Sequence, residues 1–194
     1  MSAIRSIAVF CGSKPGTDPA FRACAQRFGR LMAERGVRMV YGGGGIGLMG
    51  ILADAVLGAG GHVTGVIPEF LVRYEVGKPG LSETVVVPSM HDRKRRMFEL
   101  ADGFVVLPGG LGTLEEAIEI LTWKQLQLHA KPVVFLDVGG YWRPFSALIE
   151  HVVAQDFAHP GILELFSIVG DPAAVFQALD AAPQPNREVL TSHF

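Results

Sequence analysis

Short apolar runs and longer amphipathic stretches follow one another along the whole chain. The apolar runs are continuous rather than alternating, which indicates strands buried on both faces and therefore a parallel sheet. The longer stretches carry apolar residues at helical spacing. The predicted strands are residues 4–10, 37–41, 62–67, 84–87, 104–107, 132–136 and 166–169. The predicted helices are residues 19–35, 47–58, 90–101, one starting at 113, 142–155 and 172–181.

This alternation predicts a doubly wound α/β fold, with a parallel sheet of about seven strands and helices on both faces. Nothing in the pattern marks a linker or a repeat. We therefore predict one domain over residues 1–194, with a loosely ordered tail at 183–194. A hydrophobic fraction of 49% and a charged fraction of 19% fit a heavily buried sheet and exclude a disordered chain.

Ligands of doubly wound folds bind outside the carboxyl ends of the strands. The segments that follow predicted strands, and so meet at that edge, are residues 12–13, 42–47, 68–75, 89–94 and 109–116. Residues 69–82 also lack any periodicity. A loop of that length is unusual in a compact α/β domain and is typical of a functional segment.

Charge and cysteine content limit the partners that we expect. A net charge of −2 gives no general attraction for nucleic acid or for an acidic membrane surface. The N-terminal segment lacks a signal-peptide layout and no apolar run is long enough to cross a bilayer, so we expect a cytoplasmic protein. The histidines lack the spacing of zinc ligands. Cys11 is either a nucleophile at a strand end or a core thiol, and no partner base is evident for the first role.

The segment PGGLGTLEE, residues 108–116, lies between a predicted strand and a predicted helix. One interpretation is a capping box, in which Thr113 caps the helix and Glu116, three residues on, returns a hydrogen bond. The other is that the glycines leave backbone N–H groups open to an anion at the helix N-terminus. The local sequence leaves both interpretations open.

The segment GGGGIGLMG, residues 42–50, matches the G-x-G-x-x-G pattern twice. That pattern suits either contact with a phosphate or nucleotide, or a plain tight turn, and a glycine run meets it easily by chance. The dinucleotide-binding form is expected after the first strand, whereas this run follows the second. No Gly-Lys-Ser/Thr is present, which excludes a P-loop.

A basic run, MHDRKRRM at residues 90–97, lies in a predicted helix. Such a run is usually a solvated helix face. Cations near a helix N-terminus are unfavourable for the helix dipole, however, so a local partner such as a phosphate is expected. Helical steps of about 100° allow Arg93 to face a site while Arg95 faces water. We therefore predict Arg93 or Lys94 in a site.

Together these segments resemble the LOG ("lonely guy") family, the cytokinin-activating phosphoribohydrolases that were often labelled lysine decarboxylases. The resemblance rests on PGGLGTLEE and on the Arg-Lys pair within MHDRKRRM. It extends to FCGSKPG, YGGGGIGLMG, GHVTGVIP and TWKQL, and so covers nearly the whole chain. It implies a Rossmann-like fold and a homodimer with sites near the interface. The implied reaction cleaves the N-glycosidic bond of a nucleoside 5′-monophosphate, giving a free base and ribose 5-phosphate.

The resemblance also implies which residues act, with Arg93 and Glu116 as the catalytic pair. The implied substrate-binding residues are Glu75, Met90, Lys94, Gly109, Gly110, Leu111, Gly112, Thr113, Leu114, Glu115 and Thr122. The phosphate or nucleotide loop would comprise Ser13, Gly43, Gly44, Gly45 and Gly47. No metal and no other cofactor is implied. Lys14 stands where many members have a second serine, which is a departure at the edge of the phosphate site.

Cleavage of a ribosyl bond builds oxocarbenium character, which a nearby carboxylate stabilises while it activates water. Glu115 and Glu116 lie about 100° apart on a helix, so both cannot face one bond. We expect Glu116 to face the site and Glu115 to face solvent or structure. Arg93 would donate a hydrogen bond to the leaving base or orient the substrate. The phosphate would bind the first N–H groups of the helix, with charge from Lys94.

Two other functions remain open from the sequence. Related Rossmann-like proteins bind a nucleotide or the molybdenum cofactor as non-catalytic carriers or sensors. Lysine decarboxylation would need pyridoxal phosphate and a Schiff-base lysine, and Lys94, Lys124 and Lys131 offer no such setting. For the hydrolase, the base could be adenine or an N6-prenylated adenine.

Overall fold

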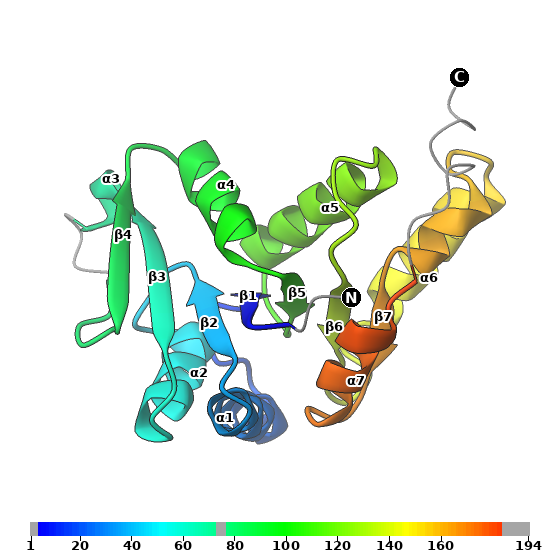
Figure 1. Ribbon diagram of the computed structural model, residues 1–194. Coiled ribbons are helices and arrows are strands. Elements are labelled where there is room, and N and C mark those ends of the chain that lie inside the picture. Colours follow the sequence, from blue (N-terminus) through cyan, green and yellow to red (C-terminus); the bar gives the residue numbers. More distant parts are fainter. Residues whose placement is uncertain (1–3, 73–76, 184–194) are drawn as a thin grey trace.

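The computed structural model describes residues 4–72 and 77–183 of the chain. These residues form a seven-stranded sheet in the order β4-β3-β2-β1-β5-β6-β7, and all neighbouring strands are parallel (Figure 1). The strands are β1 (Ser6–Phe10), β2 (Arg38–Tyr41), β3 (Val63–Pro68), β4 (Glu83–Val87), β5 (Gly103–Val106), β6 (Val133–Leu136) and β7 (Ser167–Val169). The predicted fold class is therefore confirmed.

The helices form a layer on each face of the sheet (Figure 1). They are α1 (Pro19–Glu34), α2 (Gly47–Gly58), α3 (Glu69–Val72), α4 (Met90–Leu100), α5 (Leu111–Gln125), α6 (Arg143–Ala154) and α7 (Ala174–Ala181). Helices α1, α2 and α7 share one hydrophobic cluster with the sheet, and α4, α5 and α6 share the other. The short α3, inside the predicted irregular loop, and the 3₁₀ helix Pro160–Glu164 have no counterpart in the sequence prediction.

Two helix starts show why the sequence predicts these elements well. Asp18 precedes α1, and its carboxylate accepts a hydrogen bond from the N–H of Ala20, 2.8 Å away. Ser89 precedes α4, and its hydroxyl accepts from the N–H of Asp92 at 3.1 Å. Each side chain satisfies an amide that has no acceptor within its own helix.

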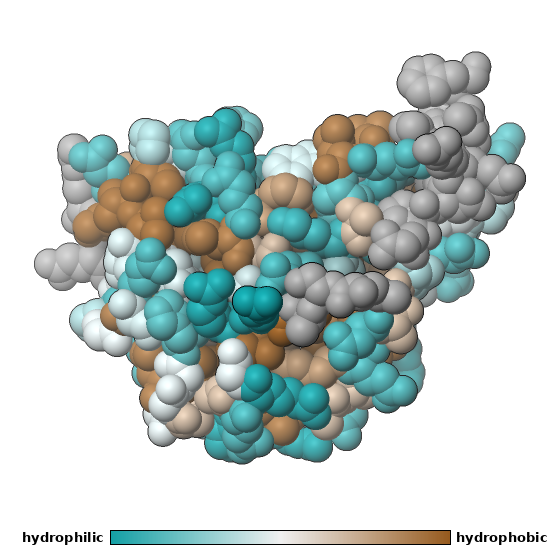
Figure 2. Space-filling view, viewed as in Figure 1, coloured by the Kyte–Doolittle hydropathy of each residue, from teal (hydrophilic) through white to brown (hydrophobic). Residues whose placement is uncertain are grey.

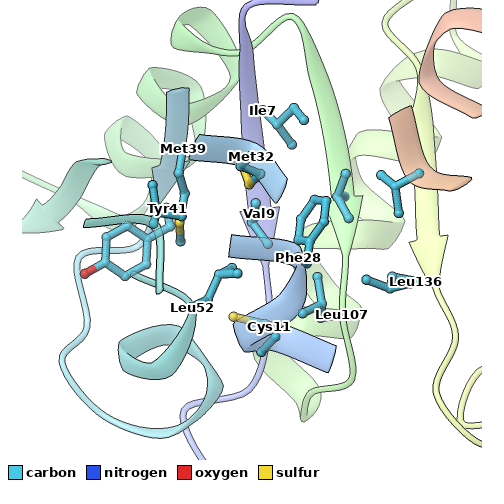
Figure 3. Packing of buried hydrophobic residues seen from close by; sticks show 14 of the residues in the cluster. Ile7, Val9, Cys11, Phe28, Met32, Met39, Tyr41, Leu52, Leu107 and Leu136 are labelled. Atoms are coloured by element: carbon cyan, nitrogen blue, oxygen red, sulfur yellow. The ribbon is translucent and has the colours of Figure 1, made fainter. Parts of the chain in front are cut away.

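The core between the sheet and α1 contains Ile7, Val9, Phe28 and Met32, all nearly or fully buried (Figure 3). Cys11 belongs to the same cluster and is only 6% exposed. Burial raises the pKa of its thiol far above the ordinary range, and the charge of Glu116 raises it further. A thiol that keeps its proton is a poor nucleophile, so the core interpretation of Cys11 holds.

The strand order reverses between β1 and β5, which makes their carboxyl ends the topological switch point. The N–H of Leu107 donates to the carbonyl of Phe10 at 2.9 Å, and the N–H of Gly12 donates to that of Pro108 at 3.0 Å. The loops after the two strands are thus joined by backbone hydrogen bonds. The single-domain prediction stays a prediction, and the tail predicted at 183–194 lies outside the described residues except for residue 183.

We predict opposite effects for two glycines of the α1–α2 layer. A β-carbon added to Gly29 would lie 2.8 Å from Cβ of Ala55 and 2.9 Å from the carbonyl oxygen of Leu52. Gly29→Ala should therefore lower the free energy of unfolding by about 1–3 kcal/mol. A β-carbon on Gly58 meets none of the described residues within 4 Å, so Gly58→Ala should be neutral or stabilise by about 0.5–1 kcal/mol. Urea denaturation measures both, and equal effects would contradict the close helix crossing.

Candidate active site

Arg93 of α4 and Glu116 of α5 face each other at the switch-point edge of the sheet. Nη1 of Arg93 lies 3.6 Å from Oε1 of Glu116, and each side chain is 12% exposed. From the sequence we expected the Glu116 side chain, and not that of Glu115, to face the site. The structure agrees, because the Glu115 side chain is 55% exposed.

The backbone of β3 and of the residue after β2 defines the position of the Arg93 guanidinium. Its Nε donates to the carbonyl of Val66 in β3 at 3.3 Å. A β-carbon on Gly42, just after β2, would lie 1.7 Å from Nη2 of Arg93. Only a residue without a side chain leaves room for the guanidinium there. Gly42 therefore makes room for the Arg93 side chain, a role that the glycine pattern alone did not indicate.

The environment of Glu116 moves its pKa toward neutrality. Burial is the largest cause and raises the pKa to about 7, while the positive charge of Arg93 opposes part of the rise. The neighbouring charge of Glu115 adds to it. A carboxyl with such a pKa exchanges its proton near neutral pH, as a group in acid–base catalysis must.

Lys94 forms a separate and more solvent-exposed cluster beside this pair. Its Nζ donates to Oε1 of Glu119 at 2.9 Å and also to Oε1 of Glu115. Burial alone would lower the pKa of Lys94, but the hydrogen bonds to the two carboxylates outweigh it and raise the pKa. The ammonium charge is thus balanced inside the protein. The predicted use of Lys94 as a phosphate cation gains no support from these contacts.

The start of α5 differs from the predicted capping box. The helix begins at Leu111 with Gly110 as its N-cap, and no side chain makes a capping hydrogen bond. Thr113 is the third helical residue and is 4% exposed, and its Oγ1 would lie 2.1 Å from a β-carbon on Gly109. The capping-box interpretation is wrong because the Thr113 side chain packs on Gly109. The N-cap therefore lies three residues earlier than predicted, at Gly110, and glycine is accepted at that position.

This start leaves the first turn of α5 accessible. The first amides of a helix have no acceptor within the helix. Among the described residues, β-carbons added to Gly110 and Gly112 would meet nothing within 4 Å beyond their chain neighbours, so there is open space beside both positions. A cavity of about 360 Å³ borders the turn. It is lined by Gly12, Ser13, Lys14, Pro15, Gly16, Phe21, Leu48, Pro108, Gly109, Gly110 and Tyr141.

The glycine run after β2 is packed differently. The N–H groups of Leu48 and Met49, in the first turn of α2, both donate to the carbonyl of Gly12 at 3.0 and 3.3 Å. A β-carbon on Gly47, whose φ is +63°, would lie 2.2 Å from the carbonyl carbon of Ser13. Gly44 pairs with Gly77 as an isolated β-bridge. These contacts are those of a tight turn; nucleotide contact by Gly43, Gly44, Gly45, Gly47 and Ser13 stays a prediction.

A search of residues 4–72 and 77–183 finds no group of three or more His, Cys, Asp or Glu side chains that could hold a metal ion. Within the same residues, no helix has both the length and the apolar character that a membrane span requires.

Comparisons with known proteins place these features in a family. A model of the family described as "possible lysine decarboxylase" matches residues 49–179. A cytokinin riboside 5′-monophosphate phosphoribohydrolase of Rhodococcoides fascians is 48% identical over 157 residues, which cover 80% of this chain and 79% of that protein. The protein LOG7 of Arabidopsis thaliana, which carries the same enzyme name, is 43% identical over 159 residues, or 82% of this chain and 73% of that protein.

The chain belongs to the LOG family.

Solved structures extend the likeness of this LOG-family chain to its fold. A molybdenum cofactor binding protein of Rippkaea orientalis aligns with a TM-score of 0.67 at 22% identity, over 93% of this chain and 98% of that one. A molybdenum cofactor carrier protein of Chlamydomonas reinhardtii aligns with a TM-score of 0.66, also at 22% identity, over 90% and 94% of the two chains. At such identities the likeness concerns the fold alone.

The other residues that the LOG resemblance assigns to the substrate do not all gather at the pair. Met90 lies beside Arg93, with Sδ 3.9 Å from Nη1. Thr122 follows Glu116 by six residues, about 120° around the helix axis, and its hydroxyl donates to the carbonyl of Ile118. It therefore lies away from the pair. Leu111 is 86% exposed and Leu114 is half-buried. Glu75 lies outside the described residues.

Two contributors to this LOG-family site were missed in the sequence. The carbonyl of Val66 holds Arg93, and a backbone acceptor carries no signal in the residue type. The hydroxyl of Tyr141 donates to the carbonyl of Gly109. Tyr141 follows β6, the neighbour of β5, so the strand-end argument applied to residues 137–142 was a usable signal.

We predict that Glu116 makes stability depend on pH. Its folded pKa is raised above the ordinary 4.5 to about 7, so the folded state holds this proton more tightly than the unfolded state. The resulting stabilisation is complete below about pH 4.5 and is lost as the pH rises through 7. Relative to Glu116→Gln, wild type should lose about 2–3 kcal/mol of unfolding free energy between pH 5 and 8.

Urea denaturation at several pH values measures this difference. Glu99→Gln is the matched control, because Glu99 lies at the surface of α4 in ion pairs with Arg95 and Arg96. Parallel curves for wild type and Glu116→Gln would show that the carboxyl does not have a raised pKa.

Proposed function

We propose that the chain hydrolyses the N-glycosidic bond of adenosine 5′-monophosphates, with or without an N6 substituent, to a free base and ribose 5-phosphate. The observation that carries the proposal is the mostly buried Arg93–Glu116 pair, which lies beside the accessible N-terminus of α5. The names of the relatives in Rhodococcoides fascians and Arabidopsis thaliana support the same reaction.

Glu116 is suited to the charge that develops in this reaction. As the base departs, positive charge builds on the ribose, and a carboxylate in a partly desolvated site stabilises it strongly. The same carboxylate can take a proton from the attacking water because its pKa is about 7. The charge of Arg93 keeps part of the population ionised.

Arg93 donates hydrogen bonds in this scheme and does not transfer a proton, because a guanidinium does not deprotonate in proteins. With Nε held by the Val66 carbonyl and Nη1 beside Glu116, the guanidinium would donate to the leaving base or to a substrate oxygen that enters next to this pair. The 5′-phosphate would bind at the start of α5, where free amides and the helix dipole attract an anion. Lys94 would then act through the Glu115 and Glu119 contacts that join α4 to α5.

Two rival functions are weaker on the same observations. A carrier of nucleotide or molybdenum cofactor does not require a mostly buried carboxyl paired with an arginine, whereas the hydrolysis uses both groups. A pyridoxal phosphate-dependent decarboxylase needs a reactive lysine in the site. Lys94 is held by two glutamates, Lys124 donates to the Leu165 carbonyl, and Lys131 donates to the Phe98 carbonyl.

Incubation with AMP and with isopentenyladenosine monophosphate, followed by chromatography of the free base, tests the reaction. Glu116→Gln should reduce release at least about 100-fold while Glu99→Gln leaves it unchanged. The kcat/KM of wild type should rise with pH through an apparent pKa near 7, because the ionised carboxyl is required. Tight binding of AMP without release of adenine by folded wild type would favour the carrier. The ratio of the two rates decides which base is preferred.

We also propose a homodimer that uses the outer stripe of α5. Leu111, Ile118 and Leu126 are 86%, 45% and 46% exposed, and helical steps bring them within about 80° of one another. Thr122 lies in the same stripe. Figure 2 shows hydrophobic surface where Figure 1 places the end of α5. Such a contact would set the partner's surface close to the start of α5. A cytoplasmic location and the lack of nucleic-acid partners stay predictions.

Light scattering after size-exclusion chromatography should give about twice the chain mass of 20.8 kDa for wild type. Ile118→Lys should shift the protein toward monomer, because it would bury an unpaired charge in the contact. Val86→Lys is the control, since Val86 is 54% exposed on β4 at the far edge of the sheet. A monomeric wild type, or a dimer unaffected by Ile118→Lys, would refute this interface.

A further inference from the structure

Tyr141 joins the turn after β6 to the loop that precedes α5. Its hydroxyl donates to the carbonyl of Gly109 at 2.5 Å. Its ring packs edge-on against Phe21 of α1, at 5.6 Å between centroids, and against Trp142, at 5.0 Å. Tyr141 also lines the cavity beside Gly109 and Gly110. The steps of the proposed reaction assign no role to this side chain.

The turn that presents Tyr141 is well anchored. Gly139 and Gly140 have φ values of +64° and +81°, which an L side chain rarely adopts. The N–H of Trp142 then donates to the carboxylate of Asp137 at 2.8 Å. The Trp142 ring is 2% exposed and packs on Phe135 of β6, at 5.0 Å between centroids. Tyr141 therefore projects from a rigid base.

The loop that Tyr141 contacts needs an external support. Gly109 and Gly110 have no side chains to restrict their backbone, and glycine samples many conformations. The N–H of Gly12 holds the carbonyl of Pro108, and the hydroxyl of Tyr141 holds the next carbonyl, that of Gly109. Because a trans peptide is planar, fixing the Gly109 carbonyl also fixes the direction of the Gly110 N–H, which points the opposite way.

We propose that Tyr141 is a positioning residue for the phosphate of the substrate. By holding the Gly109 carbonyl, it keeps the Gly109–Gly110 peptide in the orientation that presents N–H groups, and not a carbonyl oxygen, to an anion at the start of α5. A rotated peptide would set a carbonyl dipole against the phosphate. This inference rests on the proposed function, because it assigns the phosphate of a nucleoside monophosphate to this helix start.

Tyr141→Phe removes the hydroxyl and keeps the ring that packs on Phe21 and Trp142. The KM for AMP and the inhibition constant of ribose 5-phosphate should both rise about three- to tenfold, the usual effect of one hydrogen bond. The kcat should change less than twofold, since Arg93 and Glu116 are untouched. The melting temperature should fall by no more than about 4 °C, the effect of one hydrogen bond on a chain of this size. Ser146→Ala, which removes a hydroxyl bonded to Glu150 on α6, should change none of these values.

Calorimetry with AMP separates this inference from the proposed function. In a Glu116→Gln background, where the nucleotide persists, adding Tyr141→Phe should weaken AMP binding by the same three- to tenfold. Unchanged AMP affinity and unchanged KM would overturn the positioning role while leaving hydrolysis intact. A three- to tenfold fall in kcat with unchanged KM would also overturn the positioning role. If wild type releases no base, the proposed function fails, and the calorimetric comparison still decides the role of Tyr141.

Discussion

Close backbone approach at the carboxyl ends of β1 and β5 is the constraint on which the site depends. The N–H of Gly12 reaches the carbonyl of Pro108, while β-carbons on Gly109 and Gly47 would lie 2.8 Å from the nitrogen of Gly12 and 2.2 Å from the carbonyl carbon of Ser13. Side chains at these positions would force the loops apart. The glycines therefore let three loops converge, and α5 starts at the point where they meet.

Upon this frame, neighbouring residues of α4 and α5 form two ion-pair clusters with different surroundings. Arg93 and Glu116 meet over the sheet, where burial moves a carboxyl pKa to about 7. One residue along on α4, Lys94 meets the exposed Glu115 and half-buried Glu119. A step of about 100° on each helix separates the two clusters. The mostly buried Arg93–Glu116 pair has the properties expected of a reacting group. The more exposed Lys94–Glu115–Glu119 cluster links α4 to α5.

Much of the fold was predictable because its signals are local. Continuous apolar runs marked the parallel strands, and Asp18 and Ser89 marked helix starts that the structure confirms through hydrogen bonds. The start of α5 was predicted wrongly, because T-x-x-E spacing also arises where Thr113 packs on Gly109 inside a helix. The run at 42–50 fitted either a nucleotide loop or a tight turn from the sequence; in the structure Gly42 makes room for Arg93, and the first amides of α2 donate to the carbonyl of Gly12.

The sequence by itself determined the order of strands and helices, the edge of the sheet where loops gather, and the fact that Glu115 and Glu116 face different directions. These follow from periodicity, and periodicity is a property of the chain alone. Only the tertiary structure decided which groups touch: Arg93 with the Val66 carbonyl, Lys94 with two glutamates, and Tyr141 with the Gly109 carbonyl. Each joins residues at least 21 positions apart. Contacts at such separation depend on how layers pack, which no local pattern records.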